Sequence, residues 1–132
     1  MADNDQLQVE LVAADRTVWS GQATLVVAKT AEGDIGVLRN HMPVLSLLVD
    51  GVVEIVPVDG ERMYAAVDGG FLSVANNRVS ILSDHAQLPE EIDVDKARSD
   101  LEEARGLMGA NDDAERRLRR AEARIRAVEK ST

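Results

Sequence analysis

Apolar and polar residues alternate with a period of two from Leu7 to Leu82, and turn signals interrupt the alternation about every 8–12 residues. Asp59-Gly60 and Asn76-Asn77 lie between apolar runs, where such pairs indicate β-hairpin turns. Because no helix-period segment separates the expected strands, the pattern favours an antiparallel β-sandwich or barrel. The first alternating positions are Leu7, Val9 and Leu11, followed by Ala23, Leu25 and Val27.

Within this region, the stretch from Glu32 to Leu48 restricts the backbone most strongly. Gly33 follows Glu32 where a turn with positive φ is expected, and Pro43 restricts Met42 to an extended conformation. We expect a strand, then an exposed polar loop around His41, then a core strand whose whole apolar run is buried. That run comprises Val44, Leu45, Leu47, Leu48 and Val49.

After Pro89 the apolar residues are spaced three and four apart, which is typical of amphipathic helices. One series is Val94, Ala97, Leu101, Ala104 and Met108, and the next is Ala114, Leu118, Ala121, Ile125 and Val128. Asp93 can cap the first helix and Asp112-Asp113 the second. The sequence therefore predicts an α+β chain: an N-terminal antiparallel β-sandwich over residues 1–88, followed by a C-terminal antiparallel two-helix hairpin over residues 89–132.

Both helical stripes are as narrow as those of coiled coils, and they alternate large with small side chains. Such a hairpin buries little apolar surface, and isolated helices of this length are weakly stable in water. We therefore expect the hairpin to rest on another surface and to be able to let go of it.

Composition excludes several classes of function. The formal net charge of −9 argues against nucleic-acid binding, and three aromatic residues provide no platform for base stacking. The chain has no cysteine, and neither His41 nor His85 has an acidic residue at a metal-ligand helical spacing, so no metal site is expected. No nucleophile–base motif indicates catalysis. No apolar run could span a membrane and Met1–Asp5 lacks a signal-peptide core, so a cytoplasmic protein is expected.

One cluster of basic residues lies in the second expected helix. Its members are Arg116, Arg117, Arg119, Arg120, Arg124 and Arg126. The cluster is consistent with a solvated helix face, and equally with binding to carboxylates of an acidic protein surface or to a nucleotide phosphate. A free-standing β-sandwich module that binds proteins through this arginine-rich arm is therefore one possible function.

Two motifs resemble those of the epsilon subunit of the F-type, proton-translocating ATP synthase. Glu32–Leu38, followed by Asn40-His41-x-Pro43-x-Leu45, is similar to the family motif E-G-x-x-G-(I/V)-L-x-x-H-x-P-L-L. Val67–Leu72 resembles a second conserved turn, and the likeness covers nearly the whole chain. Arg39 departs from the family, in which many members carry proline.

The resemblance implies a non-catalytic central-stalk, or rotor, subunit that couples proton translocation to ATP synthesis. Its implied partners are the gamma subunit and the c-subunit ring, at the cytoplasmic face of the cell membrane, with membrane contact only through the complex. Glu32, Gly33 and Asp34 match the tip that faces the ring, and His41 falls in the stretch near gamma.

In the family, the hairpin can extend into the catalytic head and inhibit ATP hydrolysis. The resemblance thus implies contact with the catalytic alpha and beta subunits through Arg116, Arg117, Arg119 and Arg120. Some members bind regulatory ATP through an (I/L)-D-x-x-R-A motif and two later arginines, and no other cofactor is implied. The matching residues here are Asp93, Lys96, Ala97, Arg120 and Arg124, with lysine in place of the first arginine.

Overall fold

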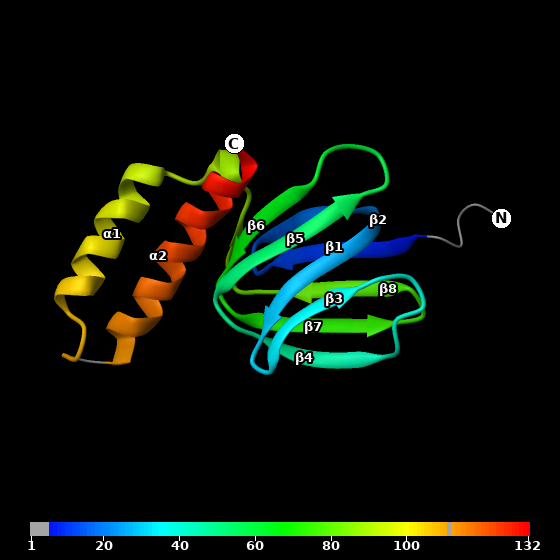
Figure 1. Cartoon of the computed structure of the whole chain (residues 1–132), viewed down its shortest axis with the longest axis horizontal. Helices are drawn as coiled ribbons and strands as arrows, with labels where there is room; N and C mark the ends of the chain where they lie inside the picture. Colours follow the sequence, from blue (N-terminus) through cyan, green and yellow to red (C-terminus); the bar gives the residue numbers. More distant parts are fainter. Residues whose placement is uncertain (1–5, 111) are drawn as a thin grey trace.

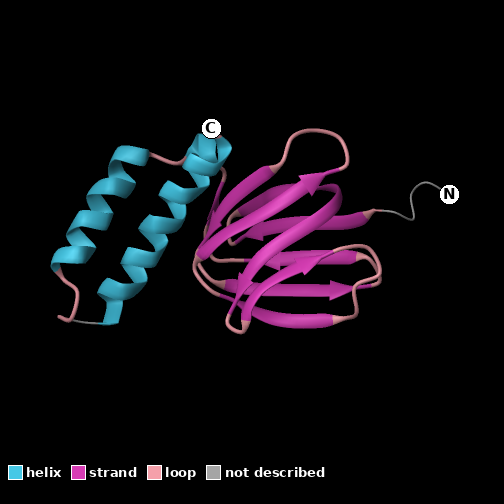
Figure 2. Cartoon of the chain, viewed as in Figure 1, coloured by secondary structure: helices cyan, strands magenta, loops and turns pink. Residues whose placement is uncertain are grey.

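The computed structural model describes residues 6–110 and 112–132, so the N-terminal stretch without a signal-peptide core lies outside the described residues. A curled sheet in two layers is followed by a helical hairpin at one end (Figures 1 and 2). The strands are β1 (Leu7–Ala13), β2 (Arg16–Thr30), β3 (Gly33–Val37), β4 (Val44–Leu48), β5 (Gly51–Pro57), β6 (Met63–Val67), β7 (Gly70–Ala75), β8 (Arg78–Leu82) and β9 (Ala86–Gln87). The 3₁₀ turn η2 (Pro89–Glu91) leads into helices α1 (Val94–Gly106) and α2 (Asp112–Ser131).

The sheet has the strand order β1-β8-β7-β4-β2-β5-β6-β9, with β3 beside β2. The long β2 pairs with β1 through its first half and with β3 and β5 through its second half, so it joins the two layers. The pairings are antiparallel except β1 with β8, which run parallel. The predicted sandwich with a two-helix hairpin is confirmed.

The sandwich encloses its own aliphatic core. Leu7, Val9 and Leu11 are fully buried, as their alternation predicted. All of the largest fully buried side chains come from strands, and none comes from α1 or α2. Burial of large side chains therefore stabilises the sandwich much more than the hairpin.

Strand β2 does not keep the predicted alternation. Its pairing with β5 shifts register between Ala23 and Leu25, and a shift of one residue exchanges the two faces of a strand. Val26 and Ala28 are consequently buried beyond the bulge, whereas Leu25 and Val27 are only half-buried.

The two predicted turns form, but with different widths. Asn76 and Asn77 have φ of 51° and 61° and connect the paired residues Ala75 and Arg78, as a two-residue hairpin turn requires. The Asp59-Gly60 turn is wider, since β5 and β6 pair only as far as Ile55 and Met63. The end of β5 pairs with β2 instead.

The prediction that the whole apolar run of β4 is buried is wrong. Leu48 is buried, but Leu45 is 71% and Leu47 is 57% exposed. The cause is the pleat of the strand, which turns alternate side chains outward onto a sheet face that no other part of the described chain covers.

Helix α1 packs against α2, and α2 lies between α1 and the sandwich (Figure 1). Asp93 caps α1 as predicted, since its side chain accepts a hydrogen bond from the Lys96 amide at 3.1 Å. Met108 lies beyond the end of α1 and is exposed, so its predicted place in the stripe is wrong. Asp112 and Asp113 lie in the first turn of α2, and the preceding residue is outside the described chain.

Candidate functional site

The predicted ring-facing tip is an ordered, exposed turn between β2 and β3. Glu32, Gly33 and Asp34 are all exposed, and Gly33 has a φ of 120°. Thr30 Oγ1 donates to the Gly33 carbonyl at 2.6 Å and accepts from the Glu32 amide at 3.2 Å. These two hydrogen bonds hold a charged tip in one conformation.

His41 lies at the other end of β3 from this tip, so the structure does not bring the two predicted contacts together. Its ring Nδ1 lies 2.7 Å from the Met42 carbonyl oxygen. The Asn40 amide donates to Asn77 Oδ1 at 2.6 Å, which places this loop against the β7–β8 turn.

Between these ends, the outer face of β4, β7 and β8 carries a row of apolar side chains. Leu47 pairs with Phe71, Phe71 with Leu82, and Leu82 with Val12 of β1. The exposed members of this apolar face are Leu45, Leu47, Phe71 and Leu82, and Leu38 and Met42 of the β3–β4 connection are exposed as well. A groove of about 570 Å³ runs beside Leu47, Phe71 and Leu82 and reaches Ala31, next to the tip.

Sequence reasoning missed this apolar face. The available signal was a strand apolar at every position but one, which is unusual for a strand with only one face toward a core. A contiguous exposed apolar surface of this kind is typical of protein–protein contact.

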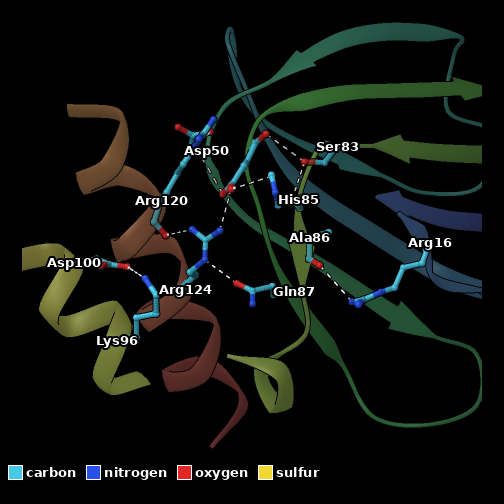
Figure 3. Close-up of polar contacts among 11 residues, drawn as sticks. Arg16, Asp50, Ser83, His85, Ala86, Gln87, Lys96, Asp100, Arg120 and Arg124 are labelled. Carbon is cyan, nitrogen blue, oxygen red and sulfur yellow. Dashed lines mark hydrogen bonds and ion pairs between the residues drawn. The ribbon is translucent and has the colours of Figure 1, made fainter. Parts of the chain in front are cut away.

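A second feature is the charged contact between α2 and two turns of the sandwich (Figure 3). Asp50 follows β4 and Asp68 follows β6, and their side chains are only 8% and 5% exposed. Arg124 Nη2 lies 2.9 Å from Asp68 Oδ2, and its Nε donates to Gln87 Oε1 at 2.7 Å. Arg120 Nε lies 3.5 Å from Asp50 Oδ1 and 3.9 Å from Asp68 Oδ1.

The arginines predicted to bind an acidic partner occupy several environments. Arg119 Nε lies 3.9 Å from Asp50 Oδ2, and Arg117 Nη2 lies 3.2 Å from Glu103 Oε1 of α1. Arg116 is exposed. Of the alternatives for this cluster, pairing with carboxylates is what the structure shows for Arg119, Arg120 and Arg124, and the carboxylates belong to the same chain.

The residues predicted to bind ATP line one cavity of about 750 Å³ between the hairpin and the sandwich, and they are Asp93, Lys96, Ala97, Arg120 and Arg124. Their charged groups already have partners, since Lys96 Nζ lies 2.9 Å from Asp100 and Arg124 binds Asp68. The lining holds five acidic and five basic side chains, so it offers no excess of positive charge.

The apolar contact under α2 is small and separate from the sandwich core. It comprises Ala66, Ile92, Ala123 and Ala127, with Val52, Tyr64 and Val128 partly buried beside them. Sequence reasoning assigned α2 a single stripe and missed Ala123 and Ala127, although their spacing of four places them on one helix face.

Among the described residues, we find no helix that combines the length and the apolar character needed to cross a membrane. The family model for the ATP synthase delta/epsilon chain β-sandwich domain matches residues 6–89. The ATP synthase epsilon chain of Streptomyces avermitilis is 53% identical over 123 residues, covering 93% of this chain and 95% of that protein. The corresponding chain of Rhodococcus jostii is 51% identical over 127 residues, covering 96% and 98%.

Two solved structures of ATP synthases also contain chains that resemble this one. A chain of the Euglena gracilis mitochondrial ATP synthase, in an OSCP/F1/c-ring assembly, matches with a TM-score of 0.78 and 25% identity, covering 96% of this chain and 81% of that chain. A chain of the Tetrahymena thermophila central stalk and c-ring shares the fold, with a TM-score of 0.56, 16% identity and 96% coverage of each chain. On its motifs, its fold and these relatives, the chain belongs to the ATP synthase epsilon chain family.

Proposed function

We propose that this chain is a non-catalytic rotor subunit of an F-type ATP synthase, where it couples proton translocation to ATP synthesis at the cytoplasmic face of the cell membrane. The observation that carries the proposal is the exposed apolar face of β4, β7 and β8 on a sandwich whose own core is complete. Such a rigid body with an uncovered apolar face suits permanent docking to another subunit. The matched Euglena gracilis chain comes from an assembly that contains F1 and the c-ring.

The two ends of β3 suit two different partners in this proposal. The charged tip Glu32–Asp34 meets the c-ring, whereas the apolar face and the neighbouring His41 loop meet the gamma subunit. A free-standing binding module would instead capture an unrelated acidic protein. Affinity purification of the full chain from membranes therefore separates the two functions, and the rotor function requires gamma and c subunits in the eluate.

We further propose that the hairpin restrains ATP hydrolysis by leaving the sandwich and contacting the catalytic subunits through its arginines. The small alanine contact under α2 supports this, because it buries no large side chain completely. We also propose that ATP binds in the cavity beside Arg120 and Arg124 and regulates that movement. Calorimetry of the full chain with ATP measures this binding directly.

Deletion of residues 90–132 is expected to raise the ATP hydrolysis rate of membranes while the complex still assembles. The reason is that the deletion removes the proposed brake but leaves the sandwich core and the apolar face intact. Hydrolysis is measured on membranes with the intact or shortened chain, and co-purification of gamma controls for assembly. An unchanged rate in fully assembled complex would exclude the brake.

A further inference from the structure

The two acidic turns of the sandwich form one unit. A Cβ placed on Gly69, in the turn that contains Asp68, would lie 3.7 Å from Asp50 Oδ1, so the turns are in contact. Asp68 is also held from its backbone, since its amide donates to the His85 carbonyl at 3.1 Å and its carbonyl accepts from Ser83 Oγ at 3.3 Å. The sandwich therefore presents two carboxylates at a fixed position beneath α2.

The positive charges opposite these carboxylates come mainly from one helix. Arg119, Arg120 and Arg124 of α2 all lie within ion-pair distance of Asp50 or Asp68. From the sandwich itself, the exposed His85 ring lies 3.9 Å from Asp68. Arg124 makes the tightest contact, and its Nη1 also donates to the Arg120 carbonyl at 3.0 Å.

The energetic cost of the two carboxylates depends on whether the hairpin is docked on the sandwich. With α2 in place they are buried, and a buried charge is costly unless it is paired. When α2 detaches, its arginines leave with it and the face of the sandwich that it covered opens to water. Asp50 and Asp68 thus make docking of α2 depend on its arginines.

We propose that Asp50 and Asp68 act as an electrostatic latch that holds the hairpin against the sandwich through Arg119, Arg120 and Arg124. The latch also withholds these arginines from any other acidic surface, so docking on the sandwich and contact with a catalytic subunit exclude each other. This regulatory consequence rests on the proposed function, whereas the latch itself is a property of the isolated chain.

The latch can be tested with a single thiol in the full chain. Because the chain has no cysteine, Ala127→Cys introduces a unique label site, which is fully buried on the side of α2 that faces the sandwich. When re-docking is faster than labelling, the rate of modification by a thiol reagent is proportional to the population in which α2 is detached. Ala65→Cys, which faces the sandwich core, reports any opening of the sandwich itself.

In the Ala127→Cys chain, Asp68→Asn and Arg124→Gln are each expected to raise the labelling rate by at least about tenfold. The labelling rate of the double variant is expected to stay close to that of the single variants. It should fall far below the product of the two single effects, since both substitutions remove the same interaction. Asp59→Asn and Arg126→Gln are the matched controls, because both side chains are exposed and neither lies in the latch.

Salt provides an independent readout. Raising NaCl from about 0.05 to 0.5 M is expected to accelerate labelling of the Ala127→Cys chain, and Asp68→Asn is expected to remove most of that response. Independent single-variant effects, or a salt response that survives Asp68→Asn, would overturn the latch. Faster labelling of Ala65→Cys in the Asp68→Asn background would also overturn it, by showing that the sandwich had loosened. None of these results depends on assembly with other subunits, so failure of the latch and failure of the proposed function are distinguishable.

Discussion

Replacing Gly70 with alanine is expected to lower the free energy of unfolding by about 3–5 kcal/mol. Gly70 has a φ of 119°, a conformation that L side chains rarely adopt, and an added Cβ would overlap the carbonyl oxygen of Leu82. That carbonyl belongs to β8, so relief of the overlap requires the two strands to separate. Urea unfolding of the full chain, followed by fluorescence of Trp19, measures the loss.

Gly60→Ala is the matched control for this prediction. Gly60 has a φ of 116°, almost the same as that of Gly70, but beyond its two chain neighbours no atom lies within 4 Å of its added Cβ. The free energy of unfolding of the Gly60→Ala chain should fall by only about 1–3 kcal/mol, which is the cost of the strained backbone conformation. Equal losses at both positions would mean that the contact with Leu82 has no energetic effect.

Phe71→Asp is expected to weaken association with the gamma subunit by a factor of about 100 or more while the free chain stays folded. Phe71 lies at the centre of the apolar face, between Leu47 and Leu82, and central aromatic residues often dominate the binding energy of an interface. Because its side chain is 50% exposed, we expect the free chain to lose only about 1 kcal/mol of stability. Binding of the purified chain to gamma and urea unfolding measure the two effects separately.

Val58→Asp provides the control for an exposed apolar side chain outside the apolar face. Val58 is 37% exposed in the β5–β6 connection, and the same change there should leave gamma binding within about twofold of the unmodified chain. Equal binding by the Phe71→Asp chain and the unmodified chain would show that gamma contacts a different surface.

The sequence predicted the classes of structure well because each is determined by a local period. Alternation identified the strands, and the spacing of three and four identified both helices. It could not predict which apolar positions of β4 face outward, since a strand with leucine on both faces has no sequence signal that separates core from interface. The bulge in β2 was hidden for a similar reason, because apolar residues follow one another from Leu25 to Val27.

The latch depends on contacts that no local pattern reveals. Asp68 and Arg124 are 56 residues apart, and each is common in its own setting, an acidic turn and a basic helix. The arginine cluster was consistent with solvent, phosphate or carboxylate until the fold placed it over Asp50 and Asp68. The assignments of Glu32–Asp34 and His41 to particular subunits remain predictions from the family resemblance.

Two neighbouring residues of β6 allow the most direct test of whether the hairpin detaches from an intact sandwich. Ala65 and Ala66 are each 2% exposed, but Ala65 belongs to the sandwich core and Ala66 to the small cluster under α2. Thiol labelling of Ala65→Cys and Ala66→Cys in the full chain is compared under identical conditions. We expect Ala66→Cys to react at least about 100-fold faster, because its protection is lost when α2 leaves, whereas that of Ala65→Cys is lost only when the sandwich opens. Equal rates at the two positions would contradict this account, since they would mean that the hairpin and the sandwich open together.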